Sequence, residues 1–200
     1  MKRLGILIVG VGGHGVVSAA RIIGDAAHLE GIPVVVGQLH GLAQRGGSVQ
    51  ATVLLGPGRS AILPRKGADV LLALEPFEAA RAIGAVGTQT TVLTNIVPRI
   101  PPTARSDTQR PPVAKLLSGL EARAARLIAF DATALAQKAG SERAVNVVML
   151  GALLGAGCVP LDPERFVTSV AADSPPATKD QNLAAFRLGR ELAARYCPAR

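Results

Sequence analysis

Aromatic residues are almost missing from this chain of 200 residues, which has no tryptophan, one tyrosine and four phenylalanines. Hydrophobic residues nevertheless make up 48% of the sequence. The core must therefore be built from Val, Leu, Ile and Ala, which suits a largely parallel sheet covered on both faces. A chain of this length can bury a substantial core, and we expect a single domain spanning residues 1–200.

Cysteine is also scarce, since only Cys158 and Cys197 are present and they form no C-x-x-C pair. Two isolated thiols cannot by themselves hold a tetrahedral zinc or an iron–sulfur cluster, so we predict free, reduced, structural cysteines and a cytoplasmic protein. No apolar run reaches the roughly 18 residues of a membrane span. The apolar residues after Met1-Lys2-Arg3 are interrupted by glycines too early for a targeting signal. We expect no membrane association.

Recognisable catalytic motifs are absent as well. The chain contains no H-E-x-x-H, G-x-S-x-G or Walker sequence, and its three histidines form no recognisable pair. The Gly-Asp-Gly with a later Asn-Asn that binds thiamine diphosphate is missing too. We therefore predict no catalytic residue and no metal site, and a chain that does not act as a catalyst alone.

The net charge of +8 and the pI near 10.5 raise the question of nucleic-acid binding. The excess positive charge comes mostly from scattered arginines, with no basic block and almost no aromatic residues on which bases could stack. We expect no nucleic-acid partner. An acidic protein or the phosphates of a substrate explain the charge better.

A buried-type strand beginning at Leu4 runs into a glycine-rich turn and then a helical pattern through Ala27. Gly10, Gly12 and Gly15 fit the G-x-G-x-x-G spacing, in which bare amides at a helix N-terminus can hold a phosphate. The second strand, Ile32–Val36, ends in Gly37 and Gln38 instead of the acidic residue that would hold a ribose, which weakens a nicotinamide or flavin site. The predicted cofactor-facing residues of this turn are Gly10, Gly12, Gly13, His14 and Gly15.

The stretch from Gly37 to Gln50 places polar side chains on a glycine-rich backbone between two apolar runs. Such a backbone can be approached closely, which indicates a contact surface. The alternative is a surface loop whose glycines only make turns. The predicted cofactor-facing residues of this stretch are His40, Gln44, Arg45, Gly46 and Gly47.

The remaining pattern predicts a three-layer, Rossmann-like α/β domain with a mostly parallel sheet. Ser48–Leu55 alternates as a strand does, and Gly56-Pro57-Gly58 turns the chain toward Ser60–Leu63, so we consider a hairpin there and expect a mixed sheet. Val70–Leu74 is a buried strand followed by Glu75. A carboxylate at the end of a central strand is placed where ligands bind in open α/β sheets. The alternative for Glu75 is a charge favoured by the N-terminus of the next helix.

Further elements follow at regular intervals. Asn146 is the one polar residue of an apolar helix and must be hydrogen-bonded, either structurally to a neighbouring loop or as a brace for a glycine loop. Gly189 suits close helix packing. We predict strands over Thr90–Thr94 and Arg126–Phe130, a surface excursion over Asn95–Pro112, and helices over 77–83, 111–124, 131–139, 145–154, 161–171 and 178–195.

Taken together, Gly-x-Gly-Gly-His-Gly followed by His-Gly-Leu-Ala-Gln-Arg-Gly-Gly-Ser resembles the gamma-type domain of the 2-oxoacid:ferredoxin oxidoreductases. The resemblance is closest to the small (beta) subunits of the indolepyruvate branch. The residues His40–Gln44 favour the branch that acts on aromatic oxoacids, because pyruvate and oxoglutarate relatives often carry Gly-Pro-Glu before Arg-Gly. His14 departs from the family, which more often has Gln there. The likeness continues through Ala68–Pro76, Asn95–Pro98, Asn146 with Leu150–Ala152, and Asn182 with Phe186 and Gly189.

The resemblance implies a subunit that holds no cofactor alone. Thiamine diphosphate and 4Fe-4S clusters would belong to a large alpha subunit, coenzyme A would be the co-substrate and ferredoxin the electron acceptor, in an alpha–beta heterodimer or a dimer of heterodimers. We hypothesise that the Gly10–Gly15 amides and the His40–Ser48 loop face the partner's cofactor cleft. Arg45 would offer a forked donor to a phosphate or carboxylate, or else form an intersubunit ion pair.

Other functions remain open from the sequence. The chain could be a stand-alone Rossmann-like nucleotide-binding protein, a gamma subunit of a pyruvate or other 2-oxoacid oxidoreductase, or a scaffolding subunit without ligand contacts.

Overall fold

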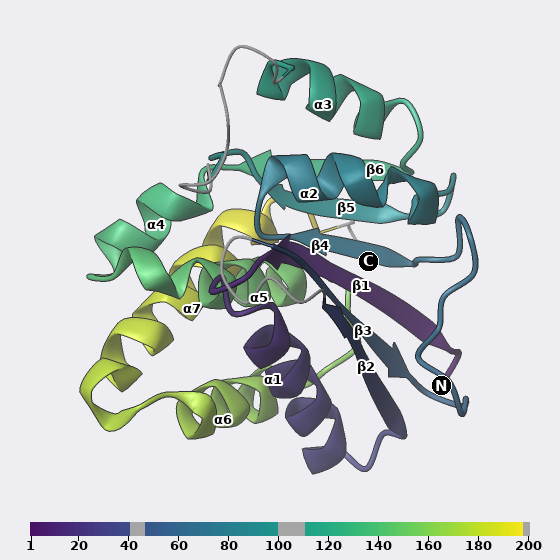
Figure 1. Ribbon diagram of the computed structural model, residues 1–200. Helices are drawn as coiled ribbons and strands as arrows, with labels where there is room; N and C mark the ends of the chain where they lie inside the picture. Colours follow the sequence, from purple (N-terminus) through teal and green to yellow (C-terminus); the bar gives the residue numbers. More distant parts are fainter. Residues whose placement is uncertain (41–46, 100–110, 198–200) are drawn as a thin grey trace.

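A computed structural model describes residues 1–40, 47–99 and 111–197 and shows a three-layer α/β arrangement, with a sheet between two layers of helices (Figure 1). Within these residues, six strands lie in the order β2-β3-β1-β4-β5-β6. The strands are β1 (Leu4–Val11), β2 (Val34–His40), β3 (Ser48–Leu55), β4 (Val70–Ala73), β5 (Thr91–Asn95) and β6 (Arg126–Phe130).

The sheet is mixed, as the sequence predicts. β1, β4, β5 and β6 are parallel neighbours, with Ile8 opposite Leu72 in the β1–β4 register. β3 is antiparallel to both β1 and β2, so the strand inserted between them interrupts the parallel order. This insertion brings the end of β2 and the start of β3 to the carboxyl end of β1.

The helices divide between the two faces of the sheet. Figure 1 shows α2 and α3 covering one face and α1, α5, α6 and α7 the other. The helices are α1 (Val16–Leu29), α2 (Pro76–Arg81), α3 (Val113–Glu121), α4 (Ala132–Lys138), α5 (Val145–Gly155), α6 (Pro163–Asp173) and α7 (Lys179–Ala194), with short 3-10 turns at Ala82–Ala85, Glu142–Ala144 and Pro176–Thr178.

Alternate residues of β1 point into different cores, because successive side chains of a strand face opposite sides of the sheet. Ile6 and Ile8 belong to the larger cluster with α1 and α5, whereas Leu7 and Val9 belong to the smaller one under α2 and α3. All four are buried. The near absence of polar residues in β1 therefore follows from burial on both faces.

α5 and α7 pack with almost no space between their backbones. A Cβ on Gly151 would lie 2.0 Å from the carbonyl oxygen of Phe186, and one on Gly189 would lie 1.9 Å from that of Val148. Gly189 thus serves the close packing expected from the sequence. Phe186 also contacts Phe166 of α6, with ring centroids 5.3 Å apart, so aliphatic packing is supplemented by one aromatic pair.

Two predictions about the strands are wrong. The second strand does not stop at Val36 but runs from Val34 to His40, because β2 is an edge strand that tolerates the polar Gln38 and pairs with β3 along its length. Ser60–Leu63 forms no strand; the hairpin partner of β3 is β2. In the 60–63 segment Ile62 is 82% exposed, and its amide donates to Ser60 Oγ at 3.2 Å instead of to a neighbouring strand.

Helix ends differ from the prediction by a few residues. The helix expected over 77–83 begins at Pro76 and ends at Arg81, where a 3-10 turn continues the chain. The helix expected over 111–124 spans Val113–Glu121. The side chains of Asp131 and Asp162 accept hydrogen bonds from the first turns of α4 and α6 and cap these helices.

Candidate functional site

The glycine turn joins β1 to α1 at the carboxyl end of the sheet. The His14 amide donates to the Val11 carbonyl at 3.0 Å. Gly13 and Gly15 have φ values of 91° and 77°, in the left-handed region that glycine adopts without a side-chain clash. Gly15 is the N-cap of α1 and provides no side-chain hydrogen bond, so the turn itself leaves the first amides of the helix without a side-chain acceptor.

The second glycine segment meets this turn through the backbone. The Gly12 amide donates to the Gly47 carbonyl at 2.8 Å. In the sheet register Gly10 lies opposite Val49, and Val49 lies opposite His40. The two motifs are therefore neighbours in space. For His40 only the backbone is described, and the predicted residues Gln44, Arg45 and Gly46 lie outside the described residues.

Glu78 anchors the start of β3 beneath this segment. Its carboxylate is 3% exposed and accepts a hydrogen bond from Ser48 Oγ. The other carboxylate oxygen pairs with Arg81 Nη1 at 2.9 Å. This anchor was missed from the sequence because a glutamate on a short helix normally faces water; only the packing of α2 on the sheet turns it inward.

His14 has no hydrogen-bond partner for either buried ring nitrogen among the described residues. Burial, together with the nearby positive charge of Arg99, lowers the pKa of His14 to about 4. The imidazole is therefore neutral at pH 7 and offers one donor and one acceptor. Buried polar groups are normally satisfied, so the His14 ring is a candidate contact for a ligand or partner group.

Glu75 caps α2. Its Oε2 accepts from the Glu78 amide at 2.9 Å, which bears out the helix N-terminal role considered as the alternative. The side chain is 1% exposed, and burial raises the pKa of Glu75, opposed by backbone amides that include those of Glu78 and Arg99. Its Oε1 accepts no hydrogen bond of good geometry from the described residues. Leu74, not Glu75, reaches the neighbouring pocket.

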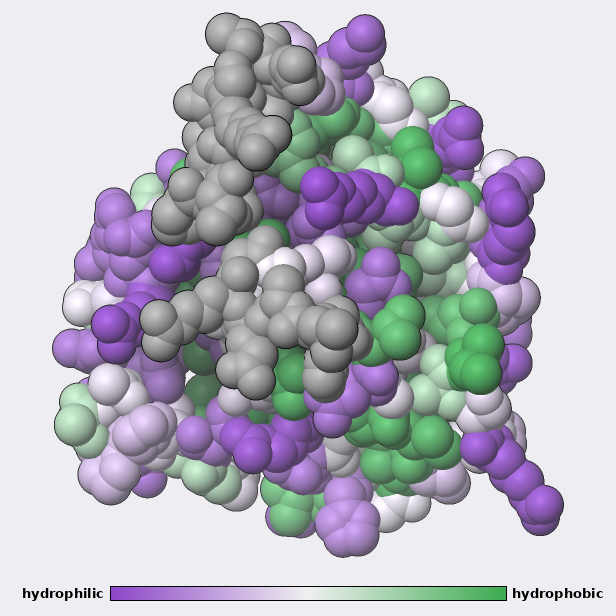
Figure 2. All heavy atoms as spheres, viewed as in Figure 1, coloured by the Kyte–Doolittle hydropathy of each residue, from purple (hydrophilic) through white to green (hydrophobic). Residues whose placement is uncertain are grey.

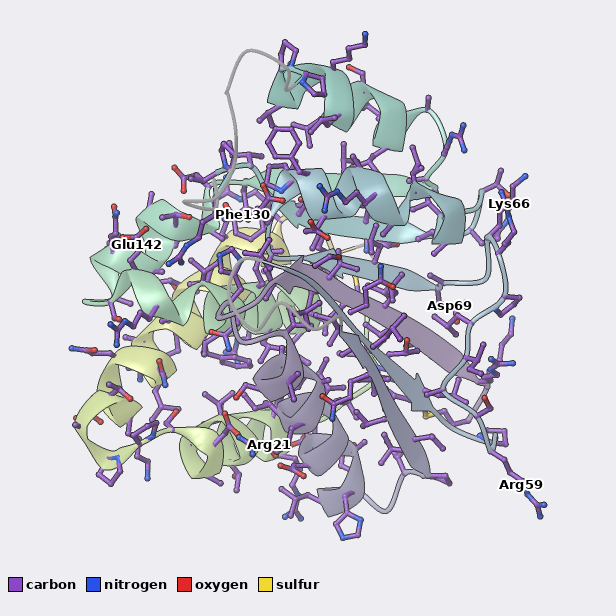
Figure 3. All side chains as sticks on the ribbon, viewed as in Figure 1. Arg21, Arg59, Lys66, Asp69, Phe130 and Glu142 are labelled. Carbon is purple, nitrogen blue, oxygen red and sulfur yellow. The ribbon has the colours of Figure 1, made fainter. Side chains whose placement is uncertain are left out.

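A pocket of about 290 Å³ opens beside His14 at the carboxyl ends of β1, β4 and β5. Two arginines, Arg99 and Arg143, give this pocket a positive character that one glutamate, Glu142, partly offsets. Such a site favours an anionic group such as a carboxylate or phosphate. Figure 3 shows Phe130 and Glu142 at this end of the sheet, whereas Lys66, Asp69 and Arg59 lie at the other. The pocket is lined by Gly13, His14, Leu74, Asn95, Val97, Pro98, Arg99, Thr133, Glu142, Arg143 and Val145.

Two buried amides hold the walls of the pocket. Asn95 Nδ2 donates to Thr133 Oγ1 at 3.1 Å, and its Oδ1 accepts from the Ala132 amide at 3.1 Å, which ties β5 to the start of α4. Asn146 Nδ2 donates to the Gly15 carbonyl at 3.4 Å. The expected bond from Asn146 to a glycine loop is thereby confirmed.

Several of these residues were not predicted as a site. Arg99 follows β5, Thr133 lies in the first turn of α4 and Arg143 lies in the 3-10 turn before α5, and no local spacing links them. Asn95 appeared only within a block of family resemblance. For Arg99 and Thr133 the signal that could have found them is their position just after parallel strands, since the carboxyl ends of such strands meet at one edge. Arg143 follows a helix and gave no such signal.

The described residues contain no group of three or more His, Cys, Asp or Glu side chains that could hold a metal ion. Among the same residues, no helix has both the length and the apolar composition needed to cross a membrane.

Residues 5–192 match the family described as pyruvate ferredoxin/flavodoxin oxidoreductase. The chain is 40% identical over 191 residues to a protein of Methanothermobacter thermautotrophicus named indolepyruvate oxidoreductase subunit IorB, a match covering 94% of this chain and 97% of the relative. The gamma subunit of a keto/oxoacid ferredoxin oxidoreductase from Geobacter sulfurreducens is 26% identical with a TM-score of 0.70, covering 95% and 98% of the two chains.

The same fold also occurs within a longer polypeptide. A 2-oxoglutarate:ferredoxin oxidoreductase from Magnetococcus marinus, solved with 2-oxoglutarate, coenzyme A and succinyl-CoA bound, matches all of this chain with 32% of its own length, at a TM-score of 0.72 and 19% identity.

Proposed function

Because the chain belongs to the pyruvate ferredoxin/flavodoxin oxidoreductase family, we propose that it is the small subunit of an indolepyruvate, or arylpyruvate, ferredoxin oxidoreductase. The observation that carries the proposal is the 40% identity, over nearly the full length of both chains, to a protein named for that activity. The reaction converts an aryl 2-oxoacid, coenzyme A and two oxidised ferredoxins into an acyl-CoA, carbon dioxide, two reduced ferredoxins and a proton.

The redox and decarboxylation cofactors belong to a partner in this proposal. A 4Fe-4S cluster takes four thiolate ligands, and the chain has two cysteines, so the residues present do not fit a cluster. The chain also lacks the thiamine diphosphate motif. A large alpha subunit would supply both groups, with ferredoxin as the electron acceptor and an alpha–beta heterodimer, or a dimer of two, as the assembly.

This chain would complete the partner's active-site cleft with its glycine turn and His14. The neutral His14 ring and the cationic Arg99 and Arg143 line one pocket, an environment that suits an anionic part of coenzyme A or of the oxoacid. Gly12 and Gly47 hold the two glycine segments together, so both would face the same cleft. Arg45 would reach this cleft from the second segment and donate two hydrogen bonds to one anion.

An apolar surface beside the second glycine segment supports an association with another chain. Leu39, which points to the same side of the sheet as the segment after β3, and Ile62 of that segment are 71% and 82% exposed. Figure 2 shows apolar side chains gathered on the face over β2, β3 and the segment that follows them. An edge strand with exposed apolar residues is an unfavourable surface in an isolated chain and a suitable one at an interface.

Reconstitution tests the proposal directly. The chain is co-expressed with a candidate large subunit that carries the thiamine diphosphate motif and the cluster-binding cysteines, and reduction of ferredoxin or a dye is followed with coenzyme A. We expect activity with indolepyruvate from the pair and none from either chain alone. A higher kcat/KM with pyruvate or 2-oxoglutarate would assign the chain to another branch, and nucleotide binding by the isolated chain would favour the stand-alone alternative.

A substitution tests whether Arg45 of this chain contributes directly to the active site of the complex. Arg45→Ala in the assembled complex should raise the KM for coenzyme A or the oxoacid, and Arg59→Ala is the matched control because Arg59 lies at the opposite end of the sheet (Figure 3). Unchanged kinetics for Arg45→Ala with intact assembly would exclude a direct role for this guanidinium.

A further inference from the structure

The two cysteines, distant in the sequence, lie next to each other at the amino-terminal end of the sheet. A Cβ on Gly157 would be 3.0 Å from Cys197 Sγ, so this sulfur rests against the residue that precedes Cys158. Both cysteines line a pocket of about 660 Å³. Cys158 is buried and Cys197 is exposed, and both are free thiols. This end of the molecule is remote from the His14 pocket and is not used by the proposed function.

One guanidinium connects the two turns that carry the thiols. Arg126, the first residue of β6, donates from Nη2 to Cys158 Sγ at 3.3 Å and to the Ala156 carbonyl at 3.1 Å. Its Nη1 donates to the Tyr196 carbonyl at 2.6 Å, directly before Cys197. A positive charge at a sulfur stabilises its thiolate, whereas burial raises the pKa of Cys158. The exposed Cys197 is therefore the accessible nucleophile and Cys158 the protected one.

The pocket around the thiols carries positive charge. Lys2 and Arg3 line it, and Arg126 lies directly behind Cys158. Asp69, the acidic residue in the lining, already accepts a hydrogen bond from the Gly5 amide at 2.7 Å. An anionic reagent is therefore attracted to the thiols more than a cationic one.

We propose that Cys158 and Cys197 form a thiol–disulfide exchange site for anionic low-molecular-weight disulfides. The Cys197 thiolate attacks one sulfur of the small disulfide, which breaks that bond and releases the first small thiol. Cys158 loses its proton to solvent and attacks Cys197 Sγ of the mixed disulfide, which releases the second small thiol. The protein loses two electrons and two protons, and the small disulfide gains them as two thiols.

The resulting bond joins the end of α7 to the turn after α5. These two helices already pack backbone to backbone through Gly151 and Gly189, so the bond links parts that are fixed relative to each other. A crosslink of this kind restricts mainly the unfolded chain, and we expect the Tm to rise by about 8 °C.

The full chain, in whatever assembly it is purified, is incubated with glutathione disulfide. Intact-mass spectrometry then measures the mass of each polypeptide separately, so a partner chain does not interfere. We expect the chain to lose the mass of two hydrogens, to retain no glutathionyl group, and to return to its starting mass and Tm with dithiothreitol. Peptide mapping should find the 158–197 crosslink. Two retained glutathionyl groups, or a disulfide between two copies, would overturn the proposal.

The order of attack is tested with single variants. Cys158→Ser should retain one glutathionyl group, because the second step is lost, and Cys197→Ser should react at least about tenfold more slowly. Equal behaviour of the two variants would contradict the assignment.

Cystamine, a cationic disulfide, should react about tenfold more slowly than glutathione disulfide at low salt, with a smaller difference at high salt. Equal rates would refute the preference for anions. None of these measurements depends on oxidoreductase activity, so the site and the proposed function can fail independently.

Discussion

Glycines gather in two regions of this molecule and do different things there. In the turn after β1, Gly13 has a φ of 91°, and a Cβ on it would meet nothing within 4 Å. In the contact between α5 and α7, Gly151 and Gly189 sit in helices, and a Cβ on either would come within about 2 Å of a backbone oxygen on the other helix. The turn needs glycine for its backbone conformation, whereas the helix pair needs it for the absence of a side chain.

The two glycine regions differ in whether they serve ligand contacts or the stability of the fold. Gly13 leaves the backbone open toward the pocket that holds His14, and a Cβ there would meet no neighbouring atom within 4 Å. At the helix pair, glycine permits dense packing in the interior, far from solvent. A substitution at Gly13 should therefore alter ligand contacts at a small cost in stability, and substitutions in the helix pair should do the reverse.

The largest effect is expected for Gly189→Ala. The added methyl group has no room beside the Val148 carbonyl, so α5 and α7 must separate, and we expect unfolding free energy to fall by about 3 kcal/mol. Gly119→Ala in α3 is the matched control, because a Cβ on Gly119 would meet nothing within 4 Å. This substitution should raise the unfolding free energy by roughly 0.5–1 kcal/mol. Urea denaturation measures both. Similar results for the two variants would show that the helix contact is not tight.

The second effect concerns pH. The pKa of His14 is lowered to about 4 in the folded chain and is near 6.5 when unfolded, so between these values the unfolded state binds the extra proton. Stability should therefore rise as pH increases from 4 to 6.5, and we expect about 2 kcal/mol from His14 after allowing for its partial exposure. Denaturation of wild type and His14→Gln across this pH range isolates the contribution of His14 to the unfolding free energy. A retained slope in His14→Gln would contradict the prediction.

A smaller effect is expected for Asn146→Ala, which removes the hydrogen bond to the Gly15 carbonyl. We expect a loss of about 1.5 kcal/mol and, because the turn is no longer braced, a raised KM in the assembled oxidoreductase. Asn182→Ala removes a bond of similar type, to Ser174 Oγ at 2.9 Å, away from the turn. That control should lose stability without a change in KM; a KM shift in both variants would indicate a general loss of folding.

The smallest loss of stability is expected for Gly13→Ala. The cost is conformational, about 1 kcal/mol, because alanine disfavours a positive φ. Gly31→Ala shares this cost, since Gly31 has a φ of 68° and no neighbour within 4 Å, but it lies after α1, away from the pocket. Thermal denaturation should give equal losses. A lower kcat/KM for Gly13→Ala but not for Gly31→Ala would support the cofactor-facing role of Gly13. Equal kcat/KM values for the two variants would argue against that role.

Local patterns predicted the elements that are buried on all sides. β4, expected over Val70–Leu74, spans Val70–Ala73 with every residue buried, and α5, apolar on all sides, was expected within a residue of its observed span of Val145–Gly155. Prediction failed at the β2 edge of the sheet. Gln38 suggested the end of a strand, but an edge strand has an exposed face where polar residues are tolerated, so β2 continued to His40.

The candidate site was predictable only in part. Both glycine motifs could be found in the sequence, and the structure places them side by side through Gly12 and Gly47. Glu75 caps α2 inside the protein, as the alternative interpretation expected, and its contact with a ligand stays a prediction. Arg143 and Thr133 carried no local signal, because their proximity to His14 depends on how α4 and the 3-10 turn before α5 pack at this end of the sheet.

The sequence by itself determined the fold class, the positions of the glycine turns and the membership of the chain in its family, because periodicity, turn chemistry and motif order are local properties. Only the tertiary structure decided which strand lies between β1 and β2, which polar groups are left without partners, and that Cys158 and Cys197 are neighbours. These features depend on contacts between segments far apart in the chain, and no local pattern encodes such distances.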